Sequence, residues 1–363
     1  MSRALERVGQ RVLGGAAAMF DRAATWAAYA QSARARRRNS SESFSHEHRI
    51  ALLGRLQKRY REVLGGDDYF REARAIDPEV RPAERARASP ETDVVDVRWP
   101  SDYETYLHEL SERYHSKVDN RRAAARLFLH PRPRPMVILV HGYMAGQYEI
   151  EQRMWPIAWL QRLGFDVALF VLPFHGVRAI RGRSGPPPFP NSDPRLSNEG
   201  FRQAMADLRD FIAWLRDRGH PSVGMMGMSL GGYTTALAAT LESELSFAVP
   251  IIPLASLADF ASDQGRLGRE PNQRREQRAA LDRAHRVISP LHRPLSLDSK
   301  RVLVVGASAD RITPIAHAQK LAGHFRAPLH RWYGGHLLQL GRGDAFREIG
   351  RLLRSLDLVD SCA

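Results

Sequence analysis

From residue 94 onward, short apolar runs with the length of strands alternate with longer segments of helical periodicity. The run Val137-Ile138-Leu139-Val140 is bulky throughout, which is typical of a strand buried on both faces. Such an alternation predicts an α/β fold, in which a mainly parallel sheet carries helices on both faces. The predicted strands are 94–99, 123–129, 136–140, 167–172, 222–228, 247–254, 302–306 and 329–332.

The first 90 residues follow a different pattern. Segments 3–30 and 48–63 have helical periodicity, and the stretch from Pro78 to Pro90, rich in Ala, Arg and Pro, is typical of a linker. We therefore expect an N-terminal helical extension with its linker over 1–90 and an α/β domain over 91–363. Within that domain, 258–299 interrupts the alternation, and 265–293 holds eight arginines against three acids. This segment is predicted to form a helical insertion over the sheet.

Composition narrows the classes of protein. The chain has 363 residues, of which 43% are hydrophobic and 26% charged, and this excludes wholesale disorder. A single cysteine, Cys362, excludes an internal disulfide and a cysteine-based zinc site. The net charge of +14 is read as solvated surface arginine, because neither zinc-finger spacing nor a helix-turn-helix pattern is present. We expect no nucleic-acid partner.

No window of about 20 apolar residues is present that would predict a membrane span. Segment 3–30 has one apolar face and is followed by Arg34 and by Arg36 to Arg38. Such a helix packs on its own domain or on a partner subunit, or it lies on a membrane surface. We favour packing and a cytoplasmic location, and peripheral membrane contact stays open as the alternative. The oligomeric state is not indicated.

The most specific motif is Gly227-Met228-Ser229-Leu230-Gly231. It follows a predicted strand and opens a predicted helix, which is the context in which a G-x-S-x-G turn exposes a nucleophilic serine. Glycines two residues before and after Ser229 leave room for a sharp turn. The motif predicts Ser229 as the nucleophile of a hydrolase.

A serine nucleophile needs a histidine base, and the histidine needs a carboxylate that orients it. In this fold class the order along the chain is Ser, Asp or Glu, His. Asp310 and His336 both follow predicted strand ends in that order, so they are the predicted acid and base. Asp259 is the main rival acid. The other histidines after Ser229 are expected to be structural or exposed: His285, His292, His317, His324 and His330.

An oxyanion hole should consist of two backbone N–H groups. The first expected donor is Leu230, directly after the nucleophile at a helix N-terminus. The second comes from the loop His141-Gly142-Tyr143-Met144, where Tyr143 is our choice and Met144 the alternative. The loop after the next strand carries His175 and Arg178. These two residues either contact substrate or belong to a loop that its Pro and Gly shape, and the sequence favours neither.

With these motifs in place, residues 94–357 resemble the α/β-hydrolase superfamily. The segments Leu-Pro-Phe-His-Gly-Val-Arg, Gly-Met-Ser-Leu-Gly-Gly-Tyr and Tyr-Gly-Gly-His are similar to those of a sparsely characterised branch of "alpha/beta hydrolase domain-containing" proteins. The resemblance implies an eight-stranded, mostly parallel sheet, a Ser–His–Asp triad, and a cap after the sixth strand, where 258–299 lies. It supplies no substrate.

The residues therefore predict a serine hydrolase that cleaves a carboxylic ester or thioester through a covalent acyl-enzyme, without a cofactor or metal. The expected partner is a small-molecule ester or a lipid-like substrate. Three alternatives stay open: a membrane-associated lipid hydrolase, a peptidase of the same fold, and a non-catalytic binding module on a hydrolase scaffold.

Overall fold

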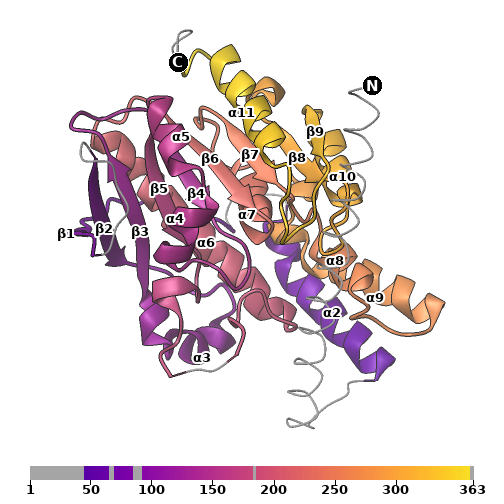
Figure 1. The fold of residues 1–363 in the computed structure, drawn as a ribbon. Coiled ribbons are helices and arrows are strands. Elements are labelled where there is room, and N and C mark those ends of the chain that lie inside the picture. The colour runs from indigo at the N-terminus through magenta and orange to yellow at the C-terminus, as the bar shows by residue number, and fades with distance from the viewer. Residues whose placement is uncertain (1–44, 65–68, 85–91, 183–184, 360–363) are drawn as a thin grey trace, which may run out of the picture.

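The computed structural model describes residues 45–64, 69–84, 92–182 and 185–359. Within them, nine strands form one sheet in the order β1-β2-β3-β5-β4-β6-β7-β8-β9 (Figure 1). The pairs from β1 through β5 are antiparallel and the remaining pairs are parallel, so the predicted α/β class is confirmed. The strands are β1 Glu79–Pro82, β2 Asp93–Pro100, β3 Arg122–Leu129, β4 Met136–Val140, β5 Asp166–Val171, β6 Val223–Met228, β7 Ala248–Ile251, β8 Val304–Ala307 and β9 Leu329–Trp332.

Strand β1 is the main departure from the expected architecture. The sequence resemblance implied eight strands, and β1 adds one at the edge by pairing antiparallel with β2. It falls inside the stretch that we expected to be a linker, and that expectation was wrong for Glu79–Pro82. A proline is tolerated there because an edge strand has one side without ladder hydrogen bonds. The sheet thus extends into the first 90 residues.

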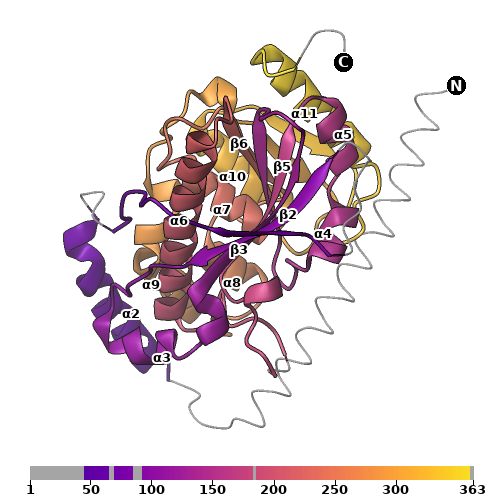
Figure 2. The same ribbon diagram turned by 90° about the vertical axis from the view of Figure 1, so that its left-hand side faces the viewer.

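Alternate side chains of each central strand enter two different cores. In β4, Ile138 and Val140 pack on one face, and Val137 and Leu139 on the other. The first face is covered by α6 (Pro194–Asp217), α7 (Leu230–Ala238) and α10 (Ile315–Phe325). The second is covered by α4 (Tyr148–Met154), α5 (Ile157–Arg162) and α11 (Gly343–Ser355). Figure 2 shows α6 on one side of the sheet and α4, α5 and α11 on the other.

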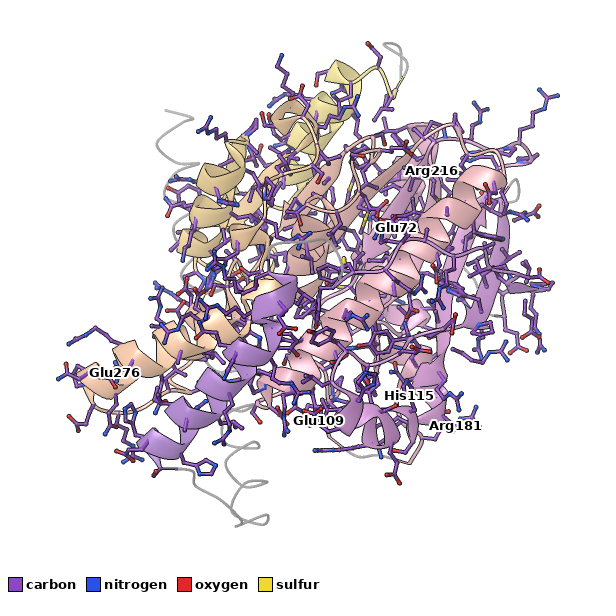
Figure 3. The ribbon with its side chains drawn as sticks, turned by 180° about the vertical axis from the view of Figure 1, so that it is seen from behind. Glu72, Glu109, His115, Arg181, Arg216 and Glu276 are labelled. Carbon is purple, nitrogen blue, oxygen red and sulfur yellow. The ribbon has the colours of Figure 1, made fainter. Side chains whose placement is uncertain are left out.

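The arginine-rich insertion folds mainly into α8 (Leu257–Asp263) and α9 (Pro271–Ala284), which confirms that it is helical. Helix α2 (His46–Tyr60), predicted as 48–63, lies beside α9 (Figure 3). His46 Nε2 lies 2.9 Å from Glu276 Oε2, and Arg283 Nε donates to Gln57 Oε1 at 3.0 Å. The N-terminal segment therefore braces the insertion.

The other end of α2 joins an aromatic cluster. Tyr60 stacks on Tyr106 with ring centroids 5.4 Å apart and meets Tyr69 edge-on at 5.6 Å. A short helix, α3 (Ser111–His115), packs nearby through the ring of Tyr114, whose hydroxyl donates to Gln203 of α6 at 2.8 Å. The first described residues are thus part of the same packed body as the sheet.

Two expectations about membranes came from the sequence, one on segment 3–30 and one on membrane spans. The amphipathic segment 3–30 lies outside the described residues. Among the helices that are described, none combines the length and the apolar character needed to span a bilayer.

Candidate active site

Ser229 lies at the junction of β6 and α7, as the motif predicted. Its backbone has φ 56° and ψ −110°, a strained conformation for a residue with a side chain. A Cβ on Gly227 would overlap the carbonyl of Gly231, and a Cβ on Gly231 would overlap the carbonyl of Val140. Only glycine fits at these two positions, so the turn can be this sharp. The N–H of Ser229 donates to Ile251 O at 2.9 Å, which ties the turn to β7.

Asp310 and His336 come together as the sequence predicted. They lie on the loops after β8 and β9, and Nδ1 of His336 is 2.7 Å from Oδ2 of Asp310. The loops are bonded to each other, because Ser308 N–H donates to Trp332 O and Ala309 N–H to Gly334 O, both at 3.0 Å.

The Asp310 carboxylate is held from its other side as well. Its Oδ1 accepts from Ile312 N and Thr313 N at 2.8 Å each, and Asp310 is only 3% exposed. An ionised carboxylate only accepts hydrogen bonds, so its neighbour at Nδ1 of His336 must be a donor. The pair therefore favours the His336 tautomer with the proton on Nδ1 and a lone pair on Nε2, which is the form that a base needs.

The loop after β4 passes beside Ser229. A Cβ built on Gly142 would stand 3.6 Å from Met228 O and 3.6 Å from Ser229 Cβ. Tyr143 follows Gly142 directly in the chain, so its peptide N–H belongs to the part of the loop that passes Ser229. Met144 has a positive φ of 63°, which marks the point where the loop reverses. This placement agrees with Tyr143 as an oxyanion donor, and the role itself stays a prediction.

His141 and Glu151 hold this loop from beneath. The N–H of Leu172 donates to His141 Nε2 at 3.0 Å, so Nδ1 carries the proton and donates to Gly142 O at 2.7 Å. Glu151 accepts from Gly146 N at 2.9 Å and from Trp155 Nε1 at 3.1 Å. Burial lowers the pKa of His141 to about 4, so the ring stays neutral near pH 7. Nothing in the sequence pointed to Glu151.

Comparison with known proteins identifies the fold. Residues 195–295 match the family model of X-Pro dipeptidyl-peptidases of the S15 family. The structure aligns with acetyl xylan esterase 1 from Thermoanaerobacterium with a TM-score of 0.53 at 18% identity, covering 84% of this chain and 94% of that one. The acetyl xylan esterase of Paenibacillus gives 0.51 at 14% identity, with 84% and 93% covered. This is an α/β-hydrolase fold.

Two relatives are similar in sequence, and their names give no function. Uncharacterized proteins of two Mycobacterium tuberculosis strains, CDC 1551 and H37Rv, are 33% identical over 232 residues, which is 62% of this chain and 55% of each relative. The chain thus spans about half the length of the curated relatives it matches.

Asp259, the alternative acid, binds two basic side chains away from His336. Asp259 lies on α8, where it accepts from Arg278 Nε at 2.6 Å and from Lys320 Nζ at 2.8 Å. The five rival histidines also have other contacts, such as Asn198 for His285 and Asp263 for His317. In the described part of the chain, His336 is the histidine whose ring contacts Asp310.

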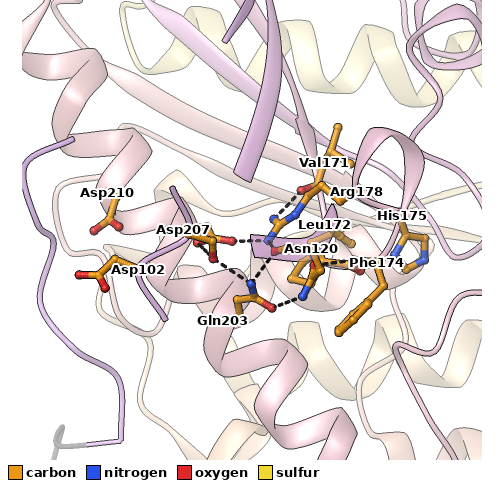
Figure 4. Close-up of polar contacts among 12 residues, drawn as sticks. Asp102, Asn120, Val171, Leu172, Phe174, His175, Arg178, Gln203, Asp207 and Asp210 are labelled. Carbon is orange, nitrogen blue, oxygen red and sulfur yellow. Dashed lines mark hydrogen bonds and ion pairs between the residues drawn. The ribbon is translucent and has the colours of Figure 1, made fainter. Parts of the chain in front are cut away.

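Arg178 corrects one expectation. It is fully buried, its Nη2 lies 2.8 Å from Asp207 Oδ2, and it donates to Val171 O and Asn120 O at 3.1 Å each (Figure 4). A guanidinium enclosed by these internal groups cannot contact substrate. Its role is to hold the loop after β5 against α6.

His175 is likewise an internal residue, at 1% exposure. Its Nδ1 lies 2.8 Å from Pro173 O, and its ring packs on His141 with centroids 5.1 Å apart. Burial, with a smaller contribution from the neighbouring His141, lowers the pKa of His175 to about 3, so the ring is neutral near pH 7. For both residues, the structure favours the second alternative, in which they belong to a loop that its Pro and Gly shape.

Six partly exposed apolar side chains follow β4, β5 and β9, at the edge of the sheet where Ser229 lies. Tyr143, Met144 and Val177 follow β4 and β5, and Tyr333, Leu337 and Leu340 follow β9; each is between 38% and 57% exposed. Gln339, between the last two, donates to Met228 Sδ at 3.6 Å, which brings that loop to the last residue of β6, directly before Ser229. We call these six residues the apolar rim. In the described ranges, no group of His, Cys, Asp and Glu side chains is arranged to hold a metal ion.

Proposed function

We propose that this protein is a serine hydrolase that cleaves carboxylic esters through an acyl-enzyme. The supporting observation is the convergence, at one edge of the sheet, of the strained Ser229 turn, the His336–Asp310 pair and the Gly142 loop. The acetyl xylan esterases, whose fold is similar, agree with this proposal. A serine, a base with a fixed tautomer and two candidate N–H donors are together sufficient for acyl transfer.

In the proposed reaction, the Ser229 hydroxyl oxygen attacks the substrate carbonyl while Nε2 of His336 accepts the hydroxyl proton. The N–H groups of Leu230 and Tyr143 stabilise the oxyanion of the tetrahedral intermediate. The C–O bond to the leaving alcohol then breaks, and His336 returns the proton to that alcohol. Water, activated by the same histidine, attacks the acyl-enzyme and releases the acid and free Ser229.

Fluorophosphonate labelling tests the nucleophile directly. The wild type is expected to form one covalent adduct, which peptide mass spectrometry assigns to Ser229, and Ser229→Ala is expected to lose it completely. Ser308→Ala is the matched control, since Ser308 is exposed and precedes Asp310 by two residues. It should label like the wild type. An unlabelled but folded wild type, or an adduct on another residue, would contradict the proposal.

The apolar rim supports an ester with an apolar acyl chain. Burying one methylene contributes about 0.8 kcal/mol, or roughly fourfold in binding, when burial is complete. The rim residues are only partly exposed, so we expect kcat/KM to rise by about tenfold from p-nitrophenyl acetate to p-nitrophenyl hexanoate. Leu340→Ser should flatten this gradient. Val80→Ser, an exposed apolar residue on β1, should leave it unchanged; a flat wild-type series would remove the acyl assignment.

The family match over 195–295 favours amide cleavage as a second candidate. An Ala-Pro-p-nitroanilide substrate in the same assay separates the two. Faster turnover of the anilide than of any ester, abolished in Ser229→Ala, would transfer the proposal to a peptidase. A thioester in the same panel tests the third acyl bond.

A further inference from the structure

Two successive carbonyls at the end of β7 serve opposite halves of the candidate site. Ile251 O accepts the N–H of Ser229 at 2.9 Å, and Ile252 O accepts the hydroxyl of Thr313 at 3.0 Å. Thr313 lies three residues after Asp310, in the loop that carries the proposed acid. The dipeptide Ile251-Ile252 therefore connects the nucleophile turn to the acid loop through two hydrogen bonds.

The backbone at Ile252 is strained. Its φ is 41°, a conformation that is a rare outlier for a β-branched residue, and its N–H donates to Val305 O of β8 at 2.7 Å. Strained backbone persists only where the surroundings enforce it, and such positions cluster at functional sites. Here the unusual φ accompanies an abrupt end of β7, which leaves the Ile252 carbonyl available to Thr313.

The Thr313 hydroxyl also reaches the proposed acid–base pair. Its Oγ1 lies 2.9 Å from Asp310 Oδ2 and 3.0 Å from His336 Nδ1. Thr313 and Asp310 are each 3% exposed and His336 is 8% exposed. One hydroxyl oxygen thus contacts the strand end, the carboxylate and the imidazole together, in a place from which bulk water is largely excluded.

Proton accounting shows what this hydroxyl can do. It has one proton, and two of its three neighbours, the Ile252 carbonyl and the Asp310 carboxylate, are acceptors. With the proton directed to either of them, a lone pair of Oγ1 remains for the N–H at Nδ1 of His336. A proton on Nε2 instead would leave the lone pair of Nδ1 facing the Asp310 carboxylate. The Thr313 hydroxyl could then donate to Nδ1 only by giving up its bond to Ile252 O or to Asp310 Oδ2, so its present partners favour the Nδ1–H form.

We propose that Thr313 is a positioning residue that holds His336 in its Nδ1–H form and ties the His336–Asp310 pair to the end of β7. The kinetic part of this inference rests on the proposed hydrolase function, and the tautomer part does not. Thr313 contacts no substrate in this proposal and acts through His336. Its loss should therefore lower kcat more than it changes KM.

Thr313→Val tests the hydroxyl, because valine keeps the shape and removes only the oxygen. We expect kcat for a p-nitrophenyl ester to fall by about 10- to 100-fold, the range for one hydrogen bond to a charged pair, with KM within threefold. Thr313→Ser, which restores the hydroxyl, should recover kcat to within threefold of wild type. Thr313→Ala replaces the valine variant if the latter does not fold.

A second readout is independent of turnover. Nitrogen NMR shifts of the His336 ring report the tautomer, and we expect Nδ1–H in the wild type and in Thr313→Ser, and a measurable Nε2–H population in Thr313→Val. An unchanged tautomer and kcat in Thr313→Val would overturn the inference, as would a serine variant that behaves like the valine variant. A wild type that turns over no ester in the panel would instead refute the proposed function, while the NMR shifts still decide the role of Thr313.

Discussion

Asp310→Asn is expected to lower kcat for ester hydrolysis about 10,000-fold while leaving the protein folded. Asp310 Oδ2 accepts the Nδ1 proton of His336 at 2.7 Å, and a carboxamide that presents its N–H₂ to that nitrogen would favour the opposite tautomer. Nε2 would then carry the proton and could not take one from Ser229. Binding of substrate does not need the tautomer, so KM should change little.

Asp259→Asn is the matched control, because Asp259 is the other acid that the sequence offered for this role. It contacts Arg278 of α9 and Lys320 of α10, away from His336, so its loss should change kcat by less than twofold. Steady-state kinetics on both variants, with unfolding curves to confirm the fold, make the comparison. A large loss in Asp259→Asn together with near-normal Asp310→Asn would reverse the assignment of the acid.

Strand positions could be predicted from the sequence where burial is complete. Strand β4 has the predicted bounds, and β5 differs by one residue at each end, because runs of bulky residues between turn residues define a strand that is buried on both faces. Strand β9 also has the predicted bounds, although only Trp332 of its four residues is buried. Strand β1 could not be predicted in this way. Its four residues, Glu79–Pro82, include two charges and a proline, and β2 alone supplies its pairing.

The sequence likewise predicted some features of the candidate site and missed others. The placement of Ser229, Asp310 and His336 was predictable because each follows a strand end, and parallel strands bring those ends to one edge. Arg178 also follows such a strand, and the same reasoning left substrate contact open for it beside a role in shaping the loop. What the sequence lacked was its partner, since Asp207 lies 29 positions later (207 − 178) in the middle of α6. Thr313 carried a weak signal, a hydroxyl three residues after the acid.

The buried Arg178–Asp207 pair is expected to contribute strongly to stability. Both side chains are at most 1% exposed, and Ser101 Oγ donates to Asp207 Oδ1 at 2.6 Å. Burial raises the pKa of Asp207, an effect that Arg178 and Ser101 oppose. Arg178→Met would leave the carboxylate without its cation, and we expect a loss of about 3–5 kcal/mol in the free energy of unfolding.

Urea denaturation of two further variants tests this expectation, because it measures the free energy of unfolding of each. Arg347→Met removes the cation of an exposed pair with Asp344 on α11, and it should cost about 1 kcal/mol or less. Arg178→Met combined with Asp207→Leu removes both charges, so it should recover part of the loss, because no uncompensated charge then remains buried. A single variant as stable as Arg347→Met would show that the pair contributes little.

The same pair connects stability to the candidate site. Arg178 donates to Asn120 O, and Asn120 Oδ1 accepts from Phe174 N at 2.9 Å, in the loop whose Leu172 N–H fixes the tautomer of His141. Loosening that loop would release the Gly142 carbonyl and with it the Tyr143 N–H. At a temperature where Arg178→Met is still folded, kcat should therefore fall with the local order of this loop. Hydrogen exchange at the amides of Leu172 and Gly142 would report that order. Faster exchange with an unchanged kcat would show that the Arg178–Asp207 pair does not affect the proposed oxyanion donor.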